Sequence, residues 1–152
     1  MNDPRLEEVR RLAEPQRYKE EFKIYLSNVR RDLEWLLNTR RIADPIPDHL
    51  RDVARSVYNY GLPDFSQENV ASQRHEQSRD RLTTAIARTI ELFEPRILDV
   101  RVVALSKQGS DPRIRFQVTG RLKVEPRPEP ICYDTVFDSA TGAFEVLGMA
   151  RA

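Results

Sequence analysis

Two pairs of carboxylates lie close enough along this sequence to suggest acid–base chemistry: Glu94 with Asp99, and Asp32 with Glu34. Hydrolysis of a glycosidic bond needs two carboxyl groups about 5–9 Å apart, one of them held protonated in an apolar pocket. Asp32 and Glu34 are two positions apart on a predicted helix and therefore do not share a face. Arg96 is close to Glu94 and favours its ionised form, which is the wrong form for a general acid. The sequence therefore favours a non-catalytic protein.

The other candidate bases and nucleophiles do not form a catalytic grouping. His49 and His75 are the two histidines, and neither belongs to an HExxH zinc motif. The sequence contains no G-x-S-x-G elbow and no glycine-rich phosphate loop. Cys132 is the single cysteine, which excludes an internal disulfide and any multi-cysteine metal site, and it is predicted to lie mid-strand without a base beside it. We therefore expect no catalytic residue, no metal site and no cofactor.

Glu94, Pro95 and Arg96 are the most informative residues of the chain, because a helical pattern changes to a strand pattern there. Pro95 has no amide hydrogen and disfavours helical geometry at the residue before it, so the upstream helix is expected to end at Glu94. Two opposite charges are then held at a rigid corner between two packed elements. Such a corner suits a docking point, and a local cap with an intramolecular ion pair is the alternative.

The first part of the chain is predicted to be an arm followed by a long helix. Residues 1–17 alternate in charge and contain two prolines, so we interpret them as a mobile or partner-ordered arm that precedes a single domain over residues 18–152. An amphipathic helix is expected over about residues 18–39. Its apolar stripe consists of Phe22, Leu26, Val29, Leu33, Leu36 and Leu37. Trp35 lies one position off this stripe, where packing against the next helix is favoured over contact with another chain.

Shorter helices are predicted between the long helix and the corner. Asp48 is the expected N-cap of a helix that ends near Tyr58, and Gly61 is expected to take a positive φ in the turn that follows. One further helical turn is predicted over residues 65–70, and the last helix over about residues 73–93.

The last third of the chain is strand-like. Apolar and polar residues alternate in four segments, over residues 97–105, 113–124, 131–137 and 143–149. Gly120 falls in the inward register of the second segment and predicts a bend or bulge. We therefore expect an α+β fold, with N-terminal helices packed on one face of a C-terminal antiparallel sheet of about four strands.

The outward row of the second predicted strand is basic. It consists of Arg113, Arg115, Arg121 and Lys123. A solvated face that guards against aggregation and a basic surface that meets acidic patches on a partner explain this row equally well. Strand edges of such a sheet must also be paired, covered or blunted.

Composition excludes several classes of partner. The chain has 152 residues, enough for one domain with its own core, and 32% of them are charged. A net charge of +1 and a pI near 7.9 do not call for a nucleic-acid or membrane partner. No apolar run approaches the roughly 20 residues that span a bilayer. We expect a cytoplasmic protein without direct membrane insertion.

Three segments together resemble the TssE family of type VI secretion baseplates, a branch of the tail-lysozyme-like wedge proteins of contractile phage tails. They are residues 29–40, 56–64 and 93–97. The resemblance implies a non-catalytic wedge component that anchors the contractile sheath and nucleates its polymerisation, in a baseplate docked at the inner membrane. Two alternatives remain: a wedge protein of a phage or phage-derived tail, and a lysozyme-type peptidoglycan hydrolase, which the carboxylates above do not support.

The resemblance also implies partners. Glu94, Pro95 and Arg96 match the family's Glu-Pro-Arg motif, which is associated with contacts to wedge core proteins of the TssF and TssG type. Other implied partners are TssK-type wedge proteins, sheath subunits of the TssB and TssC type, and as a further candidate the VgrG spike hub. The C-terminal sheet resembles the sheath subunit's interlocking domain, in which neighbours donate strands to one another. Residues expected to meet the sheath or baseplate are Arg113, Arg115, Arg121, Lys123 and Trp35.

Overall fold

The computed structural model describes residues 4–42, 46–63, 76–105 and 111–149. Its helices are α1 (Pro4–Asn38), α2 (Arg51–Ala54), the 3-10 helix η1 (Val57–Asn59) and α3 (Glu76–Phe93). Its strands are β1 (Ile97–Ala104), β2 (Arg113–Leu122), β3 (Glu129–Asp138) and β4 (Ala143–Met149). The strands form one antiparallel meander in the order β1-β2-β3-β4. The predicted α+β fold is confirmed.

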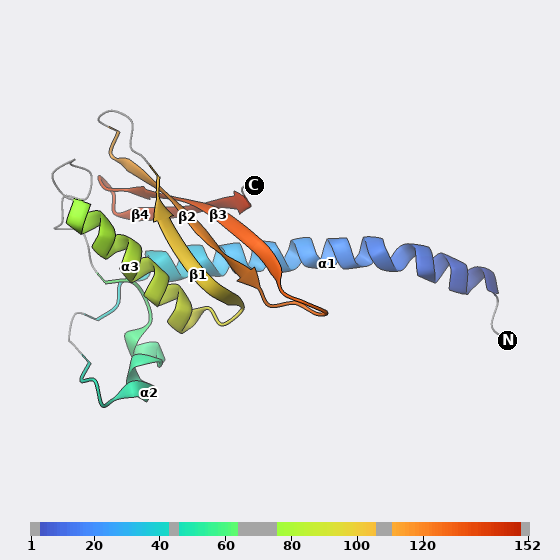
Figure 1. Cartoon of the computed structure of the whole chain (residues 1–152), viewed down its shortest axis with the longest axis horizontal. Coiled ribbons are helices and arrows are strands. Elements are labelled where there is room, and N and C mark those ends of the chain that lie inside the picture. The colour runs from blue at the N-terminus through green and yellow to red at the C-terminus, as the bar shows by residue number, and fades with distance from the viewer. Residues whose placement is uncertain (1–3, 43–45, 64–75, 106–110, 150–152) are drawn as a thin grey trace.

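The helices cover one face of this sheet. Figure 1 shows α1 running behind the strands, with its N-terminal part projecting well beyond them, and α3 lying alongside β1. α1 contacts β4, whereas α3 contacts β1, so the two long helices pack on this face near opposite edges of the sheet. None of the described helices is both long and apolar enough to cross a membrane.

The apolar stripes predicted from the sequence form the core. Among the described residues, the buried apolar side chains of α1 and α3 are Val29, Leu33, Leu36, Leu37, Leu82, Ile86 and Ile90. They face a sheet surface made by Ile114, Phe116, Val118, Leu122, Ile131, Tyr133, Phe137, Phe144 and Val146. Burying one such side chain contributes about 1.5–3 kcal/mol, whereas an exposed ion pair contributes about 0–1 kcal/mol. Apolar periodicity therefore determines which faces pack together.

The first helix differs from its predicted extent. α1 is continuous from Pro4 to Asn38, so it begins well before Tyr18. The described side chains of residues 4–7 and 17–20 are exposed, and one ion pair, between Arg17 and Glu21 at 3.1 Å, lies along the helix surface. Charged residues that are good helix formers can extend a helix in this way through contacts along its own surface. The ordering of residues 1–17 by a partner stays a prediction.

The segment between α1 and α3 is less helical than expected. α2 begins after Leu50, which makes no side-chain cap, so the prediction that Asp48 is the N-cap is wrong. α2 and η1 bury no residue, and without an apolar face a longer helix has nothing to stabilise it. Residues 65–70, where a further helical turn is predicted, and residues 73–75 of the last predicted helix lie outside the described residues.

The irregularity predicted at Gly120 is present in the facing strand. β1 shifts register between Leu98 and Arg101, and Asp99 there has a φ of 53°. A Cβ at Gly120 would lie 2.7 Å from both Ile97 Cγ2 and the Leu98 carbonyl oxygen. Glycine therefore lets β2 approach the bulged strand closely.

Candidate functional site

The Glu94-Pro95-Arg96 corner joins α3 to β1 as predicted. The Glu94 amide donates the last helical hydrogen bond to Ile90 O at 2.8 Å, and the Ile97 amide donates to Glu94 O at 3.2 Å. Pro95 lies in the turn between them and is exposed. Since Pro95 has no amide to donate, the helix ends here without losing a hydrogen bond.

Glu94 and Arg96 form a two-pronged ion pair inside this corner. Arg96 Nε donates to Glu94 Oε1 at 2.6 Å, and Arg96 Nη2 donates to Glu94 Oε2 at 2.7 Å. The Arg96 amide also approaches Oε1, at 3.3 Å. The Glu94 side chain is only 5% exposed, so it cannot itself reach a partner. Its function at this corner is to hold the guanidinium in place.

Asp32 of α1 is the third member of this cluster. Arg96 Nη2 donates to Asp32 Oδ2 at 2.7 Å. This hydrogen bond lowers the pKa of the Asp32 carboxyl below its ordinary value of 3.8. The hydrogen bonds that Arg96 donates to both carboxylates, chiefly to that of Glu94, raise the pKa of its guanidinium. The Asp32–Arg96 contact therefore stays charged at neutral pH and ties α1 to the corner.

Main-chain contacts fasten the end of β2 to the same place. The Arg96 guanidinium lies 6.0 Å from the centre of the Tyr25 ring. The Tyr25 hydroxyl donates to Lys123 O at 3.1 Å, and the Lys123 amide donates to Arg96 O at 2.8 Å. The orientation of Arg96 is thus set by α1, α3 and β2 together.

Two tyrosines lie close enough to the cluster for its charges to affect the pKa of their hydroxyl groups. Burial, and then the charges of Asp32 and Glu94, raise the pKa of Tyr60. Burial, and then Glu94, raise the pKa of Tyr133 to about 12. The Tyr133 hydroxyl donates to Leu26 O at 3.0 Å. Both tyrosine hydroxyls therefore stay protonated at neutral pH.

Part of the cluster remains available at the surface. The side chain of Arg96 is 31% exposed and that of Asp32 is 43% exposed. Within the described residues, Arg96 Nη1 makes no hydrogen bond, although this nitrogen carries two donors. Pro95, Arg96 Nη1 and Asp32 together form the surface that we call the corner face. It offers an apolar ring, two donors and one carboxylate in a fixed arrangement.

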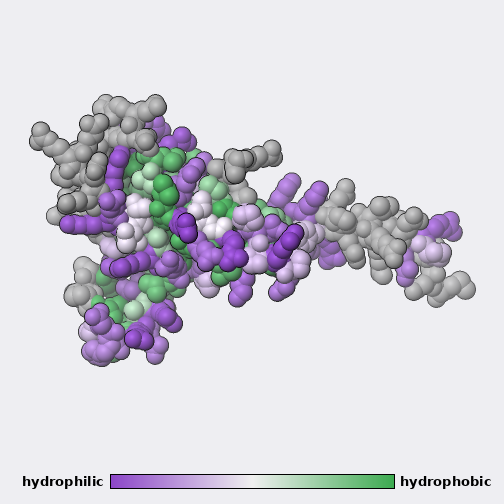
Figure 2. Space-filling model, viewed as in Figure 1, coloured by the Kyte–Doolittle hydropathy of each residue, from purple (hydrophilic) through white to green (hydrophobic). Residues whose placement is uncertain are grey.

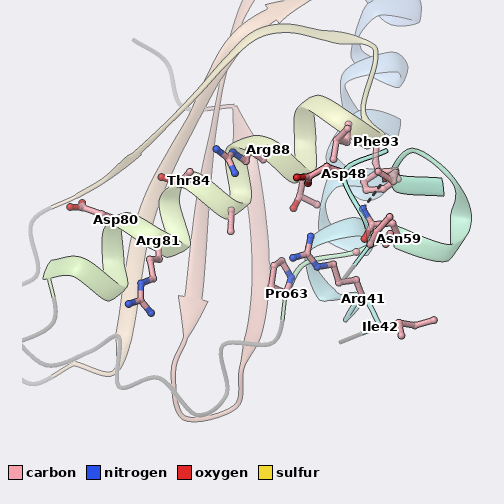
Figure 3. A pocket seen from close by; sticks show the side chains of 16 residues that line it. Arg41, Ile42, Asp48, Asn59, Pro63, Asp80, Arg81, Thr84, Arg88 and Phe93 are labelled. Carbon is pink, nitrogen blue, oxygen red and sulfur yellow. Dashed lines mark hydrogen bonds between the residues drawn. The ribbon is translucent and has the colours of Figure 1, made fainter. Parts of the chain in front are cut away.

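A separate pocket of about 830 Å³ lies between α3 and the segment that links α1 to η1. Figure 3 shows Arg81 and Arg88 on α3 and Arg41 across from them, with Asp80 and Asp48 toward opposite ends. Hydrolysis of a glycosidic bond needs two carboxyl groups close together. The separated charges of this pocket do not provide that arrangement.

Comparison with known protein families decides the identity of the fold. A family model described as baseplate wedge protein gp25 matches residues 25–127, more than half of the chain. The chain belongs to the baseplate wedge protein gp25 family. No curated protein and no solved structure matches it.

The gp25 family includes TssE, so the resemblance noted from the sequence is confirmed. The matched region begins within α1 and contains the corner with all three residues of its motif. Membership gives the chain a structural role in a baseplate and implies contacts with other baseplate components. The structure adds to this family assignment the positions and contacts of Glu94, Pro95 and Arg96.

Within each carboxylate pair considered from the sequence, the two side chains contact different partners. Glu34 accepts a hydrogen bond from the Val146 amide at 3.0 Å, whereas Asp32 contacts Arg96, so the two face different neighbours as predicted. Asp99 is exposed and paired with Arg121. Within each pair the two carboxylates are thus engaged with different groups, which suits the structural role of the gp25 family.

The thiol of Cys132, the nucleophile candidate, lacks activation. Cys132 is half-buried on β3, and burial, followed by the charge of Asp134, raises the pKa of its thiol. A raised pKa disfavours the thiolate that nucleophilic attack requires. His49 is exposed, and His75 lies outside the described residues.

The basic row on β2 is exposed but not uniform. Arg113 pairs with Asp111 at 3.1 Å, and Arg121 pairs with Asp99. Among the described residues, Arg115 and Lys123 have no ion pair. The row is therefore half neutralised by its own chain, and its contact with a partner stays a prediction.

Trp35 is not covered by another helix. Its side chain is 71% exposed on α1, so the prediction that the next helix packs against it is wrong. α3 packs chiefly against β1, and the indole of Trp35 is left in solvent. Exposed tryptophans are enriched at protein interfaces. Contact with another baseplate chain is therefore the remaining prediction for Trp35.

Sequence reasoning missed the partnership between Asp32 and Arg96. The two residues are 64 positions apart, and their contact depends on how α1 lies beneath the corner. A signal was nevertheless present, because Asp32 precedes the buried Leu33 and therefore lies at the border of the apolar stripe. A carboxylate at such a border is suited to meeting a charge on the neighbouring element.

The Asp32–Arg96 contact predicts a defined pH dependence. Because the pKa of Asp32 is lowered on folding, its contribution is present above the ordinary value of 3.8 and is lost as pH falls through the lower, folded value. Asp32→Asn should therefore cost about 0.5–1 kcal/mol near pH 7, with a difference from wild type that disappears in strong acid. Urea unfolding at a series of pH values measures this. Asp52→Asn, at an exposed site on α2, is the control and should change stability by no more than about 0.5 kcal/mol near pH 7.

Proposed function

We propose that this chain is a non-catalytic component of a type VI secretion baseplate wedge, which anchors the contractile sheath and starts its polymerisation. In this role it acts in the cytoplasm, in a baseplate docked at the inner membrane. Its corner face binds wedge core proteins of the TssF and TssG type, and its sheet meets sheath subunits of the TssB and TssC type. Membership of the gp25 family supports the baseplate part of this proposal.

The observation that carries the proposal is the way the corner is built. Glu94 is buried and fully used in holding Arg96, so two of the three motif residues, Pro95 and Arg96, are presented outward on a rigid base. A preorganised surface of this kind binds a partner without paying the entropy of ordering its own side chains. Arg96 Nη1 is suited to a carboxylate or main-chain carbonyl of the partner.

The same geometry supports the phage-type alternative. A wedge protein of a phage or phage-derived tail would use the same corner face, since the family description covers baseplate wedges in general. Identification of the proteins that copurify with the chain separates the two. Type VI wedge proteins support our proposal, and phage tail proteins support the alternative.

Pro95→Glu tests the proposal without touching the buried ion pair. The new carboxylate would stand beside Arg96 Nη1 and repel a partner group that this nitrogen attracts. We expect a folded protein that no longer copurifies with coexpressed TssF- and TssG-type proteins and no longer supports sheath assembly in cells. Circular dichroism checks the fold, and fluorescently labelled sheath subunits report assembly.

Pro47→Glu is the matched control, because Pro47 is also an exposed proline but is not part of the corner face. It should bind wedge proteins and assemble sheath as the wild type does. Normal binding and assembly by Pro95→Glu would show that the corner face is not the surface that binds wedge proteins. Release of muropeptides from peptidoglycan by the purified wild type would instead establish the hydrolase alternative.

A further inference from the structure

The hollow of about 830 Å³ between α3 and the segment that links α1 to η1 is not used by the corner face. It is lined by side chains of α3 between Asp80 and Phe93 and, on the opposite wall, by residues between Arg41 and Pro63. We call it the α3 groove. Its volume lies within the range of about 300–1,000 Å³ that is usual for ligand-binding clefts. Neither the residues of the corner face nor Pro47 line it, so it is a separate surface of the described chain.

Two arginines on opposite walls of the α3 groove have no partner. Arg88 lies on α3, and Arg41 lies across from it (Figure 3). Within the described residues neither guanidinium makes a hydrogen bond or an ion pair, whereas Arg96, Arg113 and Arg121 are each paired with a carboxylate. The groove therefore presents two guanidinium groups whose donors are available to a carboxylate from another molecule.

The carboxylates of the groove itself do not satisfy these arginines. Asp80 and Asp48 lie toward opposite ends of the groove, and among the described residues neither forms an ion pair with an arginine. Asp80 and Arg88 are about 12 Å apart along the axis of α3. An occupant that complements this order of charges has a carboxylate in its middle and a cationic side chain toward its end.

Apolar side chains are exposed beside these charges. Leu92 of α3 is 40% exposed, and Ile42 on the opposite wall is 49% exposed. Figure 2 shows hydrophobic residues at the surface of the part of the molecule that contains α2, with hydrophilic residues around them. An occupant that covers Leu92 and Ile42 gains the free energy of removing apolar surface from water, which an exposed ion pair does not supply.

The spacing along α3 indicates the secondary structure that suits this occupant. Exposed residues recur at every fourth position, so they form one row along the solvent side of the helix. The row consists of Asp80, Thr84, Arg88 and Leu92. Rows of this kind form the ridges and grooves into which a second helix packs. A helix lying along α3 can therefore contact all four positions at once.

We propose that the α3 groove binds an amphipathic helix of another baseplate protein, with a glutamate or aspartate between Arg88 and Arg41 and an apolar side chain against Leu92. A lysine or arginine about two turns from that carboxylate reaches Asp80, since eight residues of a helix span about 12 Å. Membership of the gp25 family supplies the class of partner, because it implies contacts with other baseplate components. The inference goes beyond the proposed function and holds for the baseplate of a secretion system or of a phage tail.

Photo-cross-linking in cells that assemble the baseplate tests this inference with the full chain. A benzophenone amino acid in place of Thr84, an exposed residue of the groove, should cross-link to a helical segment of a baseplate protein. Mass spectrometry identifies the captured segment, which should carry a carboxylate beside an apolar residue. The same group in place of Asp52, which is exposed on α2 but does not line the groove, should not capture it.

Charge reversal tests the role assigned to the arginines. Arg88→Glu should reduce the cross-link from Thr84 about tenfold or more, because two carboxylates would then face each other. Arg51→Glu is the matched control, since Arg51 is an exposed arginine that does not line the groove, and it should cross-link as the wild type does. Replacing the captured carboxylate by lysine should restore the cross-link to Arg88→Glu. If circular dichroism shows that Arg88→Glu is unfolded, Arg88→Gln should show a smaller loss in the same direction.

The outcomes separate this inference from the proposed function. Capture of nothing at Thr84, capture of a segment without a carboxylate, or a cross-link that Arg88→Glu leaves unchanged would overturn the inference. A cross-link to residues 64–75 of the same chain, or to a second copy of it, would replace the partner helix by the chain itself and also overturn it. Capture of a phage tail protein with the expected carboxylate would support the inference and overturn only the secretion-system part of the proposed function.

Discussion

Arg96→Ala is expected to lower the free energy of unfolding by about 3–5 kcal/mol. The variant leaves the Glu94 carboxylate buried, at 5% exposure, without the two donors that now satisfy it. A buried carboxylate that has lost its partner retains the cost of leaving water and gains nothing in return. Urea unfolding monitored by circular dichroism measures the change.

Removing both charges together provides the control. Glu94→Leu combined with Arg96→Met should cost clearly less than Arg96→Ala, because no unpaired charge remains in the interior. Arg96→Lys keeps the charge but cannot form the two-pronged contact, so it should lie between wild type and Arg96→Ala. If Arg96→Ala unfolds within about 1 kcal/mol of wild type, the ion pair is not a structural element. These effects also show why Pro95→Glu, rather than Arg96→Ala, is the cleaner test of partner binding.

Gly61→Ala is expected to lower the free energy of unfolding by about 3 kcal/mol, through backbone strain and a steric clash acting together. Gly61 has a φ of 118°, which a residue with a Cβ rarely adopts. The added carbon would lie 2.5 Å from Thr39 O, at the end of α1. The melting temperature should fall by about 6–12 °C for a chain of this size, as thermal circular dichroism would show.

The clash at Gly61 would also disturb a local connection. Leu62 donates its amide to Thr39 O at 2.8 Å, and the Arg41 amide donates to Leu62 O at 3.0 Å. Gly148→Ala is the matched control, because a Cβ there meets nothing within 4 Å, and it should change stability by no more than about 0.5 kcal/mol. Equal melting temperatures for the two variants would show that the close approach to Thr39 does not constrain the fold.

The order of the elements could be predicted because each has its own apolar period. The alternation in residues 113–124 and the four-residue spacing of Leu82, Ile86 and Ile90 are both local, and both are buried as expected. Pro95 marked the end of α3 for an equally local reason. Such signals need no knowledge of which element packs against which.

The site could be predicted only in part, because its contacts are not local. The sequence placed Glu94 and Arg96 at one corner but left docking and internal pairing as alternatives. Burial of Glu94 and its distant link to Asp32 follow from the position of α1 beneath the sheet. The exposure of Trp35 has the same origin, since it depends on where α3 packs and not on the spacing within α1. Tertiary packing therefore decided what local patterns left open.

The hydrogen bonds that join Arg30, Glu34 and Asn38 of α1 to the edge of β4 have a mechanical consequence. α1 has 35 residues and is about 52 Å long. Its N-terminal part projects beyond the sheet, and its C-terminal part is hydrogen-bonded to the last strand. Tension along the helix axis is shared by the contacts of Arg30, Glu34 and Asn38 at the same time. These hydrogen bonds would therefore not break one after another. A pull on the N-terminal end is thereby delivered to the sheet as a whole.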